Sequence, residues 1–400
     1  MYLSTWTYPW DVARLGVDTV LADLARHGIA GIDLAATYHP ISAVSPRGPH
    51  LTPFFSPAGA VFFPAQHARY ARIMPHVWPD ARVVGTWPAV AERLGTYGLE
   101  LHAWTICLFQ PWLAQQHPDT ARVYATGEAL DTGVCASNPD VRAYLRALVG
   151  DLVDQFPIGV VKLEGIAPPR YDYGWTRRRV YVGLTPAQEH ALSLCFCAAC
   201  RARAEDRGLD VDGVRAAALA VLATERTPAD EAAGLLRDYQ QVARDASTSL
   251  VRELGVIVHR ARRRLAVPTP IDGTAPGVAI DDVIDEVDVV MLAGLPRDRA
   301  ALDHTVDVLT AKAPRPSLEY FLHPPFTGQT AGGLPTGIDE DLADPHFRGH
   351  VRPTRRDRHA SVTSPRRSRT ASRYSTAIGL TGDRWRQRTS QWLVTGRAGG

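Results

Sequence analysis

The chain is short of three features that would place it in a class at once. None of its apolar runs reaches about 18 residues, the length of a membrane-spanning helix, so we expect no membrane span. Its N-terminus shows no basic stretch followed by an apolar run and a small-residue cleavage site, so we expect no signal peptide and a cytoplasmic protein. Only five of its 400 residues are cysteine, and a cytoplasmic protein seldom joins such thiols as disulfides.

Charge is distributed unevenly along the chain. Residues 351–400 contain twelve Arg and two Asp but no Lys, a net charge of +10, which leaves about −8 for residues 1–350. The same fifty residues hold thirteen Ser and Thr, so we treat them as a separate segment. The body is mildly acidic, which indicates no affinity for nucleic acid; binding of nucleic acid through the Arg-rich tail is an alternative.

Strand-like runs alternate with helical periodicity through the body. Helical patterns cover Asp11–Arg26, Val90–Tyr97, Pro139–Gln155 and Arg297–Ala311, and helices dominate residues 186–264. Asn138 or Ser137 is the expected N-cap of the third helix. The seven expected strands are Tyr2–Thr7, Gly31–Ala36, Leu99–Leu108, Ile158–Leu163, Leu265–Ile271, Val287–Ala293 and Ser317–Leu322. Strict alternation of seven such units predicts a parallel sheet, either a barrel or an open doubly wound sheet.

The segment after the first strand distinguishes between these two predicted folds. It reads TYPWDVARLG and has no Gly-rich phosphate loop, which argues against a dinucleotide-binding fold. The sequence therefore predicts an α/β fold of the (β/α)₈ TIM-barrel type. The loops after the second, third and fourth strands are long and rich in aromatic residues, and in a barrel all three lie on the catalytic face.

Two glutamates lie at or near the ends of apolar strands. Glu164 ends the fourth strand and Glu319 lies in the seventh. Two facing carboxylates in such a position can cleave a glycosidic bond, one as general acid and the other as nucleophile or base. The simpler alternative is that each Glu caps its strand or pairs with an Arg.

Aromatic and hydrogen-bonding side chains collect on the same expected face. Flat rings that stack on sugars, mixed with polar groups, suit a carbohydrate-binding cleft. Singly, each of these side chains is more often structural, so the prediction depends on their clustering. The candidate substrate-binding residues are Tyr38, His39, Arg47, His50, His102, Trp104, Tyr171, Asp172, Tyr173 and Trp175.

Three of the five cysteines fall within six positions. The spacing of Cys195, Cys197 and Cys200 can bring three thiolates onto one ion, and soft sulfur ligands favour zinc. A fourth ligand is needed, and Cys107 or Cys135 can supply it. The alternatives are three buried free thiols, or a redox pair of Cys197 and Cys200, for which the strand–CxxC–helix context is missing.

Four segments of the chain resemble a known family. They read LHAWTICLF, VCASNPDVRAYLRALVGDLV, VVKLEGI and LSLCFCAACRARAEDRGLD. A barrel strand that ends in Glu, followed by a loop and a C-[FY]-C-x-x-C motif opening a helix, is similar to the β-galactosidases of glycoside hydrolase family 42. It is more similar still to uncharacterised glycosidase-like barrel proteins of bacteria, in actinobacterial chains. The resemblance covers roughly residues 1–325.

The resemblance implies roles for individual residues. Glu164 maps to the acid/base of family 42 and Glu319 to its nucleophile. The cysteine cluster maps to a structural zinc site formed by Cys195, Cys197 and Cys200, with Cys107 as the fourth ligand, and no organic cofactor is expected. In family 42 an Asn precedes the acid/base, whereas this chain has Leu163. That departure favours an alternative in which the barrel has lost catalysis and only binds a glycan.

The C-terminal segment departs from a barrel pattern. We expect residues 1–330 to form the barrel and residues 331–400 an Arg/Ser/Thr-rich tail, either disordered or translated out of frame. An eighth strand is expected between about residues 330 and 390, yet that stretch has neither apolar alternation nor a helical stripe. The last β/α unit is therefore expected to be incomplete or irregular, leaving the edges of the first and seventh strands exposed.

Overall fold

A computed structural model gives the fold of the chain. It describes residues 2–46, 51–56, 59–167, 171, 182–223, 230–269, 278, 280–292, 307–308, 311, 316–322 and 393–398.

The strands are short and spread along the whole chain. They are β1 (Tyr2–Thr7), β2 (Gly31–Tyr38), β3 (Ser42–Pro46), β4 (Leu51–Phe55), β5 (Ala60–Val61), β6 (Glu100–Ile106), β7 (Ala121–Val123), β8 (Ala129–Val134), β9 (Ile158–Glu164), β10 (Arg264–Thr269), β11 (Val289–Leu292), β12 (Ser317–Leu322) and β13 (Leu393–Ala398).

The helices lie between these strands. They are α1 (Pro9–Leu15), α2 (Val17–Arg26), η1 (His67–Arg69), α3 (Ala81–Val84), α4 (Thr86–Tyr97), α5 (Pro111–Gln116), η2 (Pro118–Thr120), α6 (Pro139–Gln155), α7 (Pro186–Ser193), α8 (Ala198–Glu205), α9 (Val211–Leu222), α10 (Asp230–Arg260) and α11 (Ile280–Val283). No helix in this described set is both long and apolar enough to cross a bilayer.

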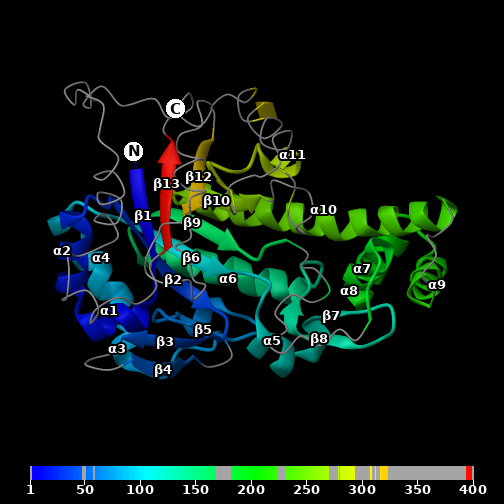
Figure 1. Cartoon of the computed structure of the whole chain (residues 1–400), viewed down its shortest axis with the longest axis horizontal. Coiled ribbons are helices and arrows are strands. Elements are labelled where there is room, and N and C mark those ends of the chain that lie inside the picture. The colour runs from blue at the N-terminus through cyan, green and yellow to red at the C-terminus, as the bar shows by residue number, and fades with distance from the viewer. Residues whose placement is uncertain are drawn as a thin grey trace.

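One curled sheet forms the centre of the molecule (Figure 1). Parallel pairing runs from β1 through β2, β6, β9, β10 and β11 to β12. The carboxyl ends of all seven strands therefore point the same way, as the sequence predicted for an α/β fold.

The C-terminal strand lies between the two ends of this sheet. β13 pairs antiparallel with β12 on one side and with β1 on the other, as the red arrow in Figure 1 shows. The edges of β1 and β12 are thus both paired, contrary to the expectation that they would be exposed. The stretch in which the eighth strand was expected, 330–390, lies outside the described residues.

Most sequence boundaries agree with the structure to within a few residues. The expected helix Asp11–Arg26 is instead two helices, because Gly16 adopts φ 89° between α1 and α2. Asn138 is the N-cap of α6, and its side chain accepts hydrogen bonds from the backbone N–H groups of Asp140 and Val141. The loop expected after the second strand contains β3, β4 and β5, and most of the helix expected at 297–311 lies outside the described residues.

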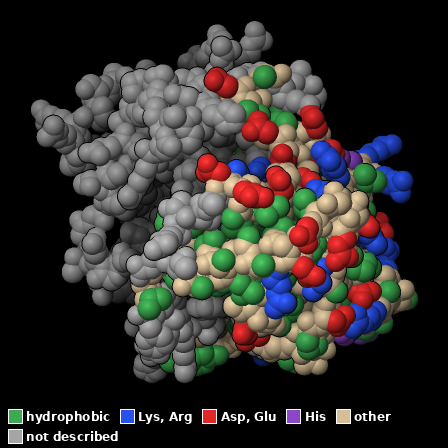
Figure 2. Space-filling view, turned by 90° about the vertical axis from the view of Figure 1, so that its right-hand side faces the viewer, with side chains coloured by type: hydrophobic (Ala, Val, Ile, Leu, Met, Phe, Trp, Pro, Cys, Tyr) green, Lys and Arg blue, Asp and Glu red, His purple; other side chains and the backbone are tan. Residues whose placement is uncertain are grey.

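A second, smaller core lies beside the sheet. In Figure 1, α10 extends past the sheet, and α7, α8 and α9 gather beneath its far part. Phe196 stacks on Tyr239 of α10 with ring centroids 4.8 Å apart, and Leu236 and Val214 are buried in the same cluster. Figure 2 shows this side of the molecule, where acidic and basic side chains are interspersed over the described surface.

Gly31 permits a close approach inside the sheet. It pairs with Ser4 of β1, and a Cβ atom there would lie 2.5 Å from the Tyr2 hydroxyl and 2.8 Å from Cε1 of His102. Gly95, in α4, is exposed and has nothing within 4 Å of the equivalent position. The two glycines therefore differ in packing.

We predict that Gly31→Ala destabilises the protein by about 1–3 kcal/mol, since the added methyl group overpacks a crowded interior. Gly95→Ala, the matched control, should be neutral or stabilising by up to about 1 kcal/mol. Urea unfolding followed by circular dichroism measures both. Equal effects of the two substitutions would contradict the packing described for Gly31.

Candidate functional site

Glu164 is a carboxyl group in an environment of low polarity. It is the last residue of β9 and is partly buried, and the indole N–H of Trp104 donates a hydrogen bond of 2.5 Å to its Oε2. Burial raises the pKa of Glu164 to about 7, against a smaller lowering by the hydrogen bond from Trp104. This carboxyl group can therefore exchange a proton near neutral pH.

Aromatic rings surround this carboxyl group. The ring centroid of Trp104 lies 4.5 Å from that of Tyr38 and 5.3 Å from that of Tyr8. Tyr38 stacks on His39, with centroids 4.2 Å apart. Tyr8 in turn stacks on Trp10 at 4.4 Å. Burial raises the pKa of the Tyr8 hydroxyl, as does the nearby Glu164, and burial lowers the pKa of His39. The structure thus brings the predicted Tyr38, His39 and Trp104 together at one end of the sheet.

Sequence reasoning missed Tyr8 and Trp10. Tyr8 follows β1 directly and Trp10 lies at the start of α1, so both are at the carboxyl end of the strand, where the aromatic-rich loops were expected. The stretch TYPWD contains both rings within four residues of the strand, and that signal was available.

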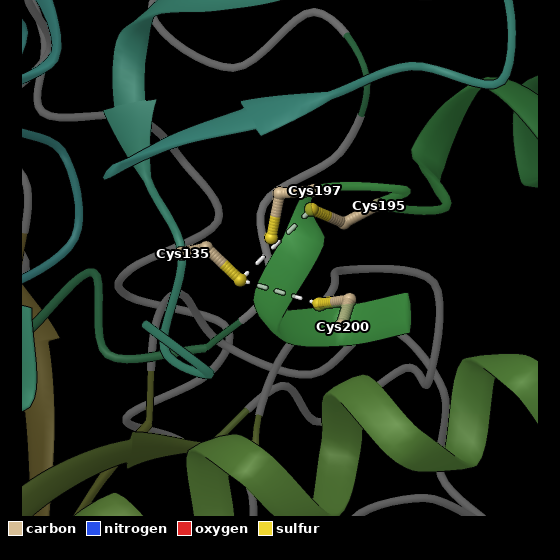
Figure 3. Close-up of side chains that lie close together, drawn as sticks. All are labelled: Cys135, Cys195, Cys197 and Cys200. Atoms are coloured by element: carbon tan, nitrogen blue, oxygen red, sulfur yellow. Dashed lines mark hydrogen bonds between the residues drawn. The ribbon is translucent and has the colours of Figure 1, made fainter. Parts of the chain in front are cut away.

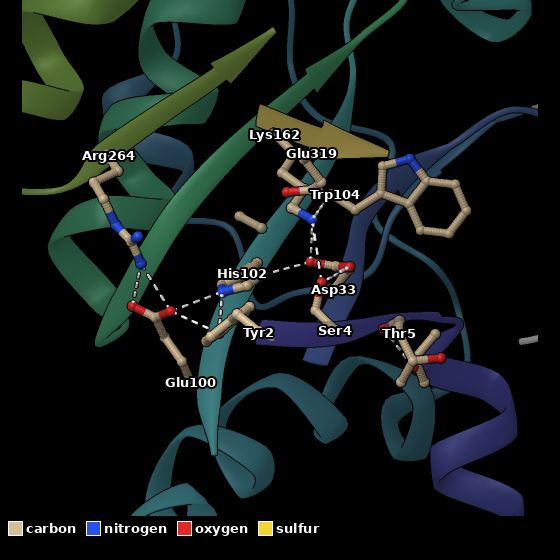
Figure 4. Close-up of polar contacts among 12 residues, drawn as sticks. Tyr2, Ser4, Thr5, Asp33, Glu100, His102, Trp104, Lys162, Arg264 and Glu319 are labelled. Carbon is tan, nitrogen blue, oxygen red and sulfur yellow. Dashed lines mark hydrogen bonds and ion pairs between the residues drawn. The ribbon is translucent and has the colours of Figure 1, made fainter. Parts of the chain in front are cut away.

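Glu319 lies inside the curled sheet and is fully enclosed. Its carboxylate forms an ion pair with the ammonium of Lys162, which also lies 2.7 Å from Oδ1 of Asp33 (Figure 4). All three side chains have no exposed surface. Glu319 therefore points to the interior of the sheet rather than toward the helices.

His102 belongs to the same interior rather than to a surface of a cleft. Its Nδ1 lies 2.5 Å from Asp33 Oδ1, its Nε2 lies 3.0 Å from Glu100 Oε2, and its side chain has no exposed surface. Arg264 donates two hydrogen bonds to Glu100, at 2.6 and 2.8 Å. The position of His102 is explained by its carboxylate partners.

The remaining predicted substrate-binding residues lie elsewhere or outside the description. Tyr171 is buried, and its backbone carbonyl accepts a hydrogen bond of 2.6 Å from the Tyr124 hydroxyl. Arg47, His50, Asp172, Tyr173 and Trp175 lie outside the described residues.

Four cysteines form a buried cluster (Figure 3). Their sulfur atoms lie within 4.8 Å of one another. Sγ of Cys135 is 3.3 Å from that of Cys200 and 3.9 Å from that of Cys195, and Cys197 completes the group. Four thiolates at about 2.3 Å from one tetrahedral zinc have sulfurs about 3.8 Å apart, so this spacing fits that ion.

Elements far apart in the sequence assemble the cluster. Cys135 follows the β7–β8 hairpin, whereas the other three cysteines lie around the start of α8. The backbone N–H of Phe196 donates to the Val123 carbonyl at 2.7 Å, and the Tyr239 hydroxyl donates to the Cys195 carbonyl at 2.9 Å. Hydrogen bonds from the neighbouring thiols lower the pKa of Cys195, which favours a thiolate at this sulfur.

Cys107 is not the fourth member of the cluster, and that prediction is corrected. Its thiol donates to the backbone carbonyl of Thr105 at 3.6 Å, at the end of β6. Burial raises the pKa of the Cys107 thiol, and nearby Glu164 raises it further. Cys135, the alternative that the sequence left open, occupies the fourth place.

Comparisons with known proteins give neighbours by structure alone. No protein-family model matches the chain, and no curated protein matches it. The β-galactosidases of Marinomonas ef1 and Halorubrum lacusprofundi are 14% and 15% identical to it, each with a TM-score of 0.45. The match covers 74% and 75% of this chain and 41% of each β-galactosidase, so the chain spans about two fifths of their length.

A third neighbour is similar to this chain over most of its own length. It is the glycoside hydrolase domain of PgaB (BpsB) from Bordetella bronchiseptica, with 13% identity and a TM-score of 0.44. The match covers 77% of this chain and 80% of that domain. The three neighbours are glycoside hydrolases at low sequence identity.

The pKa of Glu164 predicts a pH dependence of stability. Its pKa in the folded state, about 7, lies above its ordinary value of 4.5, so the folded protein holds this proton more tightly than the unfolded chain. The resulting stabilisation is complete below pH 4.5 and is lost as the pH rises to about 7. Glu164→Gln removes the titration.

We expect the unfolding free energy of the native protein, relative to Glu164→Gln, to fall by up to about 3 kcal/mol between pH 4.5 and pH 7.5. Urea unfolding at several pH values measures the difference. Glu92→Gln, at a largely exposed side chain of α4, is the control and should show no such trend. A pH-independent difference between the native protein and Glu164→Gln would refute the environment described for Glu164.

Proposed function

We propose that this chain is a glycoside hydrolase-like protein built on a (β/α)₈-type barrel and acting on a carbohydrate. Glu164 serves as the general acid/base in this proposal. The supporting observation is a carboxyl group at the carboxyl end of a strand that accepts a hydrogen bond from an indole and has aromatic rings around it, where burial raises its pKa to about 7. A general acid works best when its pKa lies near the working pH.

Glu319 is the proposed second carboxylate. It is paired with an ammonium, whereas Glu164 has no ion pair among the described residues. Two carboxyl groups in such unlike environments divide naturally into an acid and a base or nucleophile. The resemblance to glycoside hydrolase family 42 assigns the same two positions. Asp33, which shares Lys162 with Glu319, is the nearest replacement if Glu319 is not the reacting group.

A second candidate function is glycan binding without hydrolysis. The side chain of Glu319 is fully enclosed, and Leu163 occupies the position of the family 42 Asn before the acid/base. Both observations favour a barrel that has kept the aromatic rings around Glu164 for sugar binding and lost the second catalytic group.

Hydrolysis and binding measured on one panel of aryl glycosides and oligosaccharides separate these functions. We expect Glu164→Gln to lower hydrolysis by about 10²–10⁴-fold while glycan binding persists. The loss should be smaller for aryl glycosides with good leaving groups, which need little protonation. Activity of the native protein should fall as the pH rises through about 7, because the acid must carry its proton.

Glu92→Gln is the control and should keep full activity. Binding of a glycan by the native protein without any hydrolysis would establish the second candidate function. Neither binding nor hydrolysis across the panel would reject the carbohydrate proposal.

We also propose that the four-cysteine cluster binds a structural zinc ion. All four cysteines are buried, and a closed set of four sulfur ligands is typical of structural rather than catalytic zinc. Cys135, Cys195, Cys197 and Cys200 would hold the ion. The ion would tie the β7–β8 hairpin to the start of α8.

Elemental analysis of protein prepared without chelator should give close to one zinc per chain. Cys135→Ser should lower zinc content and thermal stability, because metal binding contributes to folding. Cys107→Ser, which changes an equally buried thiol outside the cluster, should keep its zinc. Zinc-free native protein, or equal zinc content in the two variants, would reject the site.

A further inference from the structure

Charged side chains run through the interior of the curled sheet (Figure 4). We name the chain of contacts from Glu100 through His102, Asp33 and Lys162 to Glu319 the interior column. The side chains of its last four members have no exposed surface, whereas that of Glu100 is 33% exposed. Strands β2, β6, β9 and β12 thus each place an ionisable side chain in the interior of the sheet.

The neighbours of the two ring nitrogens of His102 are oxygen atoms. Nδ1 faces a carboxylate oxygen of Asp33 at 2.5 Å, and Nε2 faces a carboxylate oxygen of Glu100 at 3.0 Å. The Tyr2 hydroxyl, also 3.0 Å from Nε2, donates its own hydrogen to Glu100 at 2.7 Å. Both ring nitrogens therefore face acceptors, and only the doubly protonated imidazolium can donate from both.

Among the described residues, the charges of the column and its partner Arg264 are then balanced. The carboxylates of Asp33, Glu100 and Glu319 face the cations of His102, Lys162 and Arg264, the last of which binds Glu100 from β10. An unpaired charge in such an interior is strongly unfavourable. Loss of one cation would leave the remaining ones to be shared among three carboxylates.

Lysine at position 162 contrasts with the composition of the chain. Lys162 and Lys312 are its only lysines, against 42 arginines. A compact ammonium with three donors can lie between two carboxylates and a hydroxyl, and Lys162 also reaches Ser4 Oγ at 3.5 Å. A planar guanidinium is larger and fits this enclosed space less well.

We propose that Lys162 is the positioning residue of Glu319, and that an imidazolium at His102 maintains it by balancing the charge of Asp33. The role for Glu319 rests on the proposed function, whereas the ion pair itself does not. With His102 charged, Asp33 is shared between two cations and Lys162 remains available to Glu319. Without that charge, Asp33 competes with Glu319 for Lys162.

The scarcity of lysine permits a direct test on the full chain. Protein labelled with ¹⁵N-lysine has two side-chain nitrogen signals, and Lys312→Arg assigns them. We expect an ammonium signal from Lys162 that exchanges slowly with solvent at pH 7 and shifts in both Glu319→Gln and Asp33→Asn. A neutral amine at Lys162, or a nitrogen signal whose chemical shift is unchanged in both variants, would overturn the ion pair.

Histidine labelling tests the second half. In ¹⁵N-histidine protein at pH 7, the His102 ring should show two protonated nitrogens, assigned by its disappearance in His102→Gln. A ring with one bare nitrogen would overturn the imidazolium. Neither spectroscopic test needs a substrate, so their results do not depend on the proposed glycosidase activity.

Activity then tests the positioning role. Lys162→Met should lower hydrolysis by about 10²-fold and move the acidic limb of the pH profile upward, because Glu319 loses its nearby cation. Lys162→Arg keeps a cation in a space that fits it less well, so it should restore the acidic limb only in part, and Lys312→Arg should change neither property. A folded Lys162→Met with an unmoved pH profile would overturn the positioning role. Absence of hydrolysis in the native protein would instead reject the proposed hydrolytic activity, and with it the positioning role.

Discussion

The ammonium of Lys162 between the carboxylates of Asp33 and Glu319 is the interaction on which the interior depends. A buried charge is tolerated only when its partners are close and fully engaged. That requirement explains why polar and small residues surround the ammonium. Ser4 donates a hydrogen bond to Asp33 at 2.8 Å, and Gly31 leaves room for the Tyr2 hydroxyl and the His102 ring. The interior of this sheet is therefore organised by ionic and hydrogen-bonded contacts as well as by apolar packing.

The same pairing makes the two glutamates unlike. Lys162 and Glu164 are two residues apart on β9, so their side chains face the same side of the sheet about 6.6 Å apart along the strand. Because Lys162 is engaged by Asp33 and Glu319, Glu164 has an indole N–H and aromatic rings as neighbours instead. Burial then dominates its pKa. The single ammonium of Lys162 thus contacts Glu319 and Asp33, whereas burial leaves Glu164 able to carry a proton near neutral pH.

Local patterns in the sequence were sufficient for much of the fold. β1, β12 and α6 have the predicted boundaries, since each is an apolar run or amphipathic stripe with clear ends, such as the Asn138 cap. The division of the first helix at Gly16 was missed because the apolar stripe continues across the glycine. The antiparallel pairing of β13 could not be predicted, since a strand of six residues in a polar tail has no local signal of its partners.

The sequence predicted the chemical types of the sites better than the individual residues that form them. Spacing identified three cysteines, but the fourth depends on which loop packs against α8. Cys107 and Cys135 both follow strands, and only the β7–β8 hairpin, held by the Phe196 hydrogen bond to Val123, brings its cysteine to the cluster. His102 was predicted to bind substrate but lies in the interior. A polar residue within an apolar strand can face either a cleft or an interior partner. The Asp33 carboxylate of the neighbouring strand β2 decides between these two positions, and this contact joins residues far apart in the sequence, whereas Glu100 lies two residues away on the same strand.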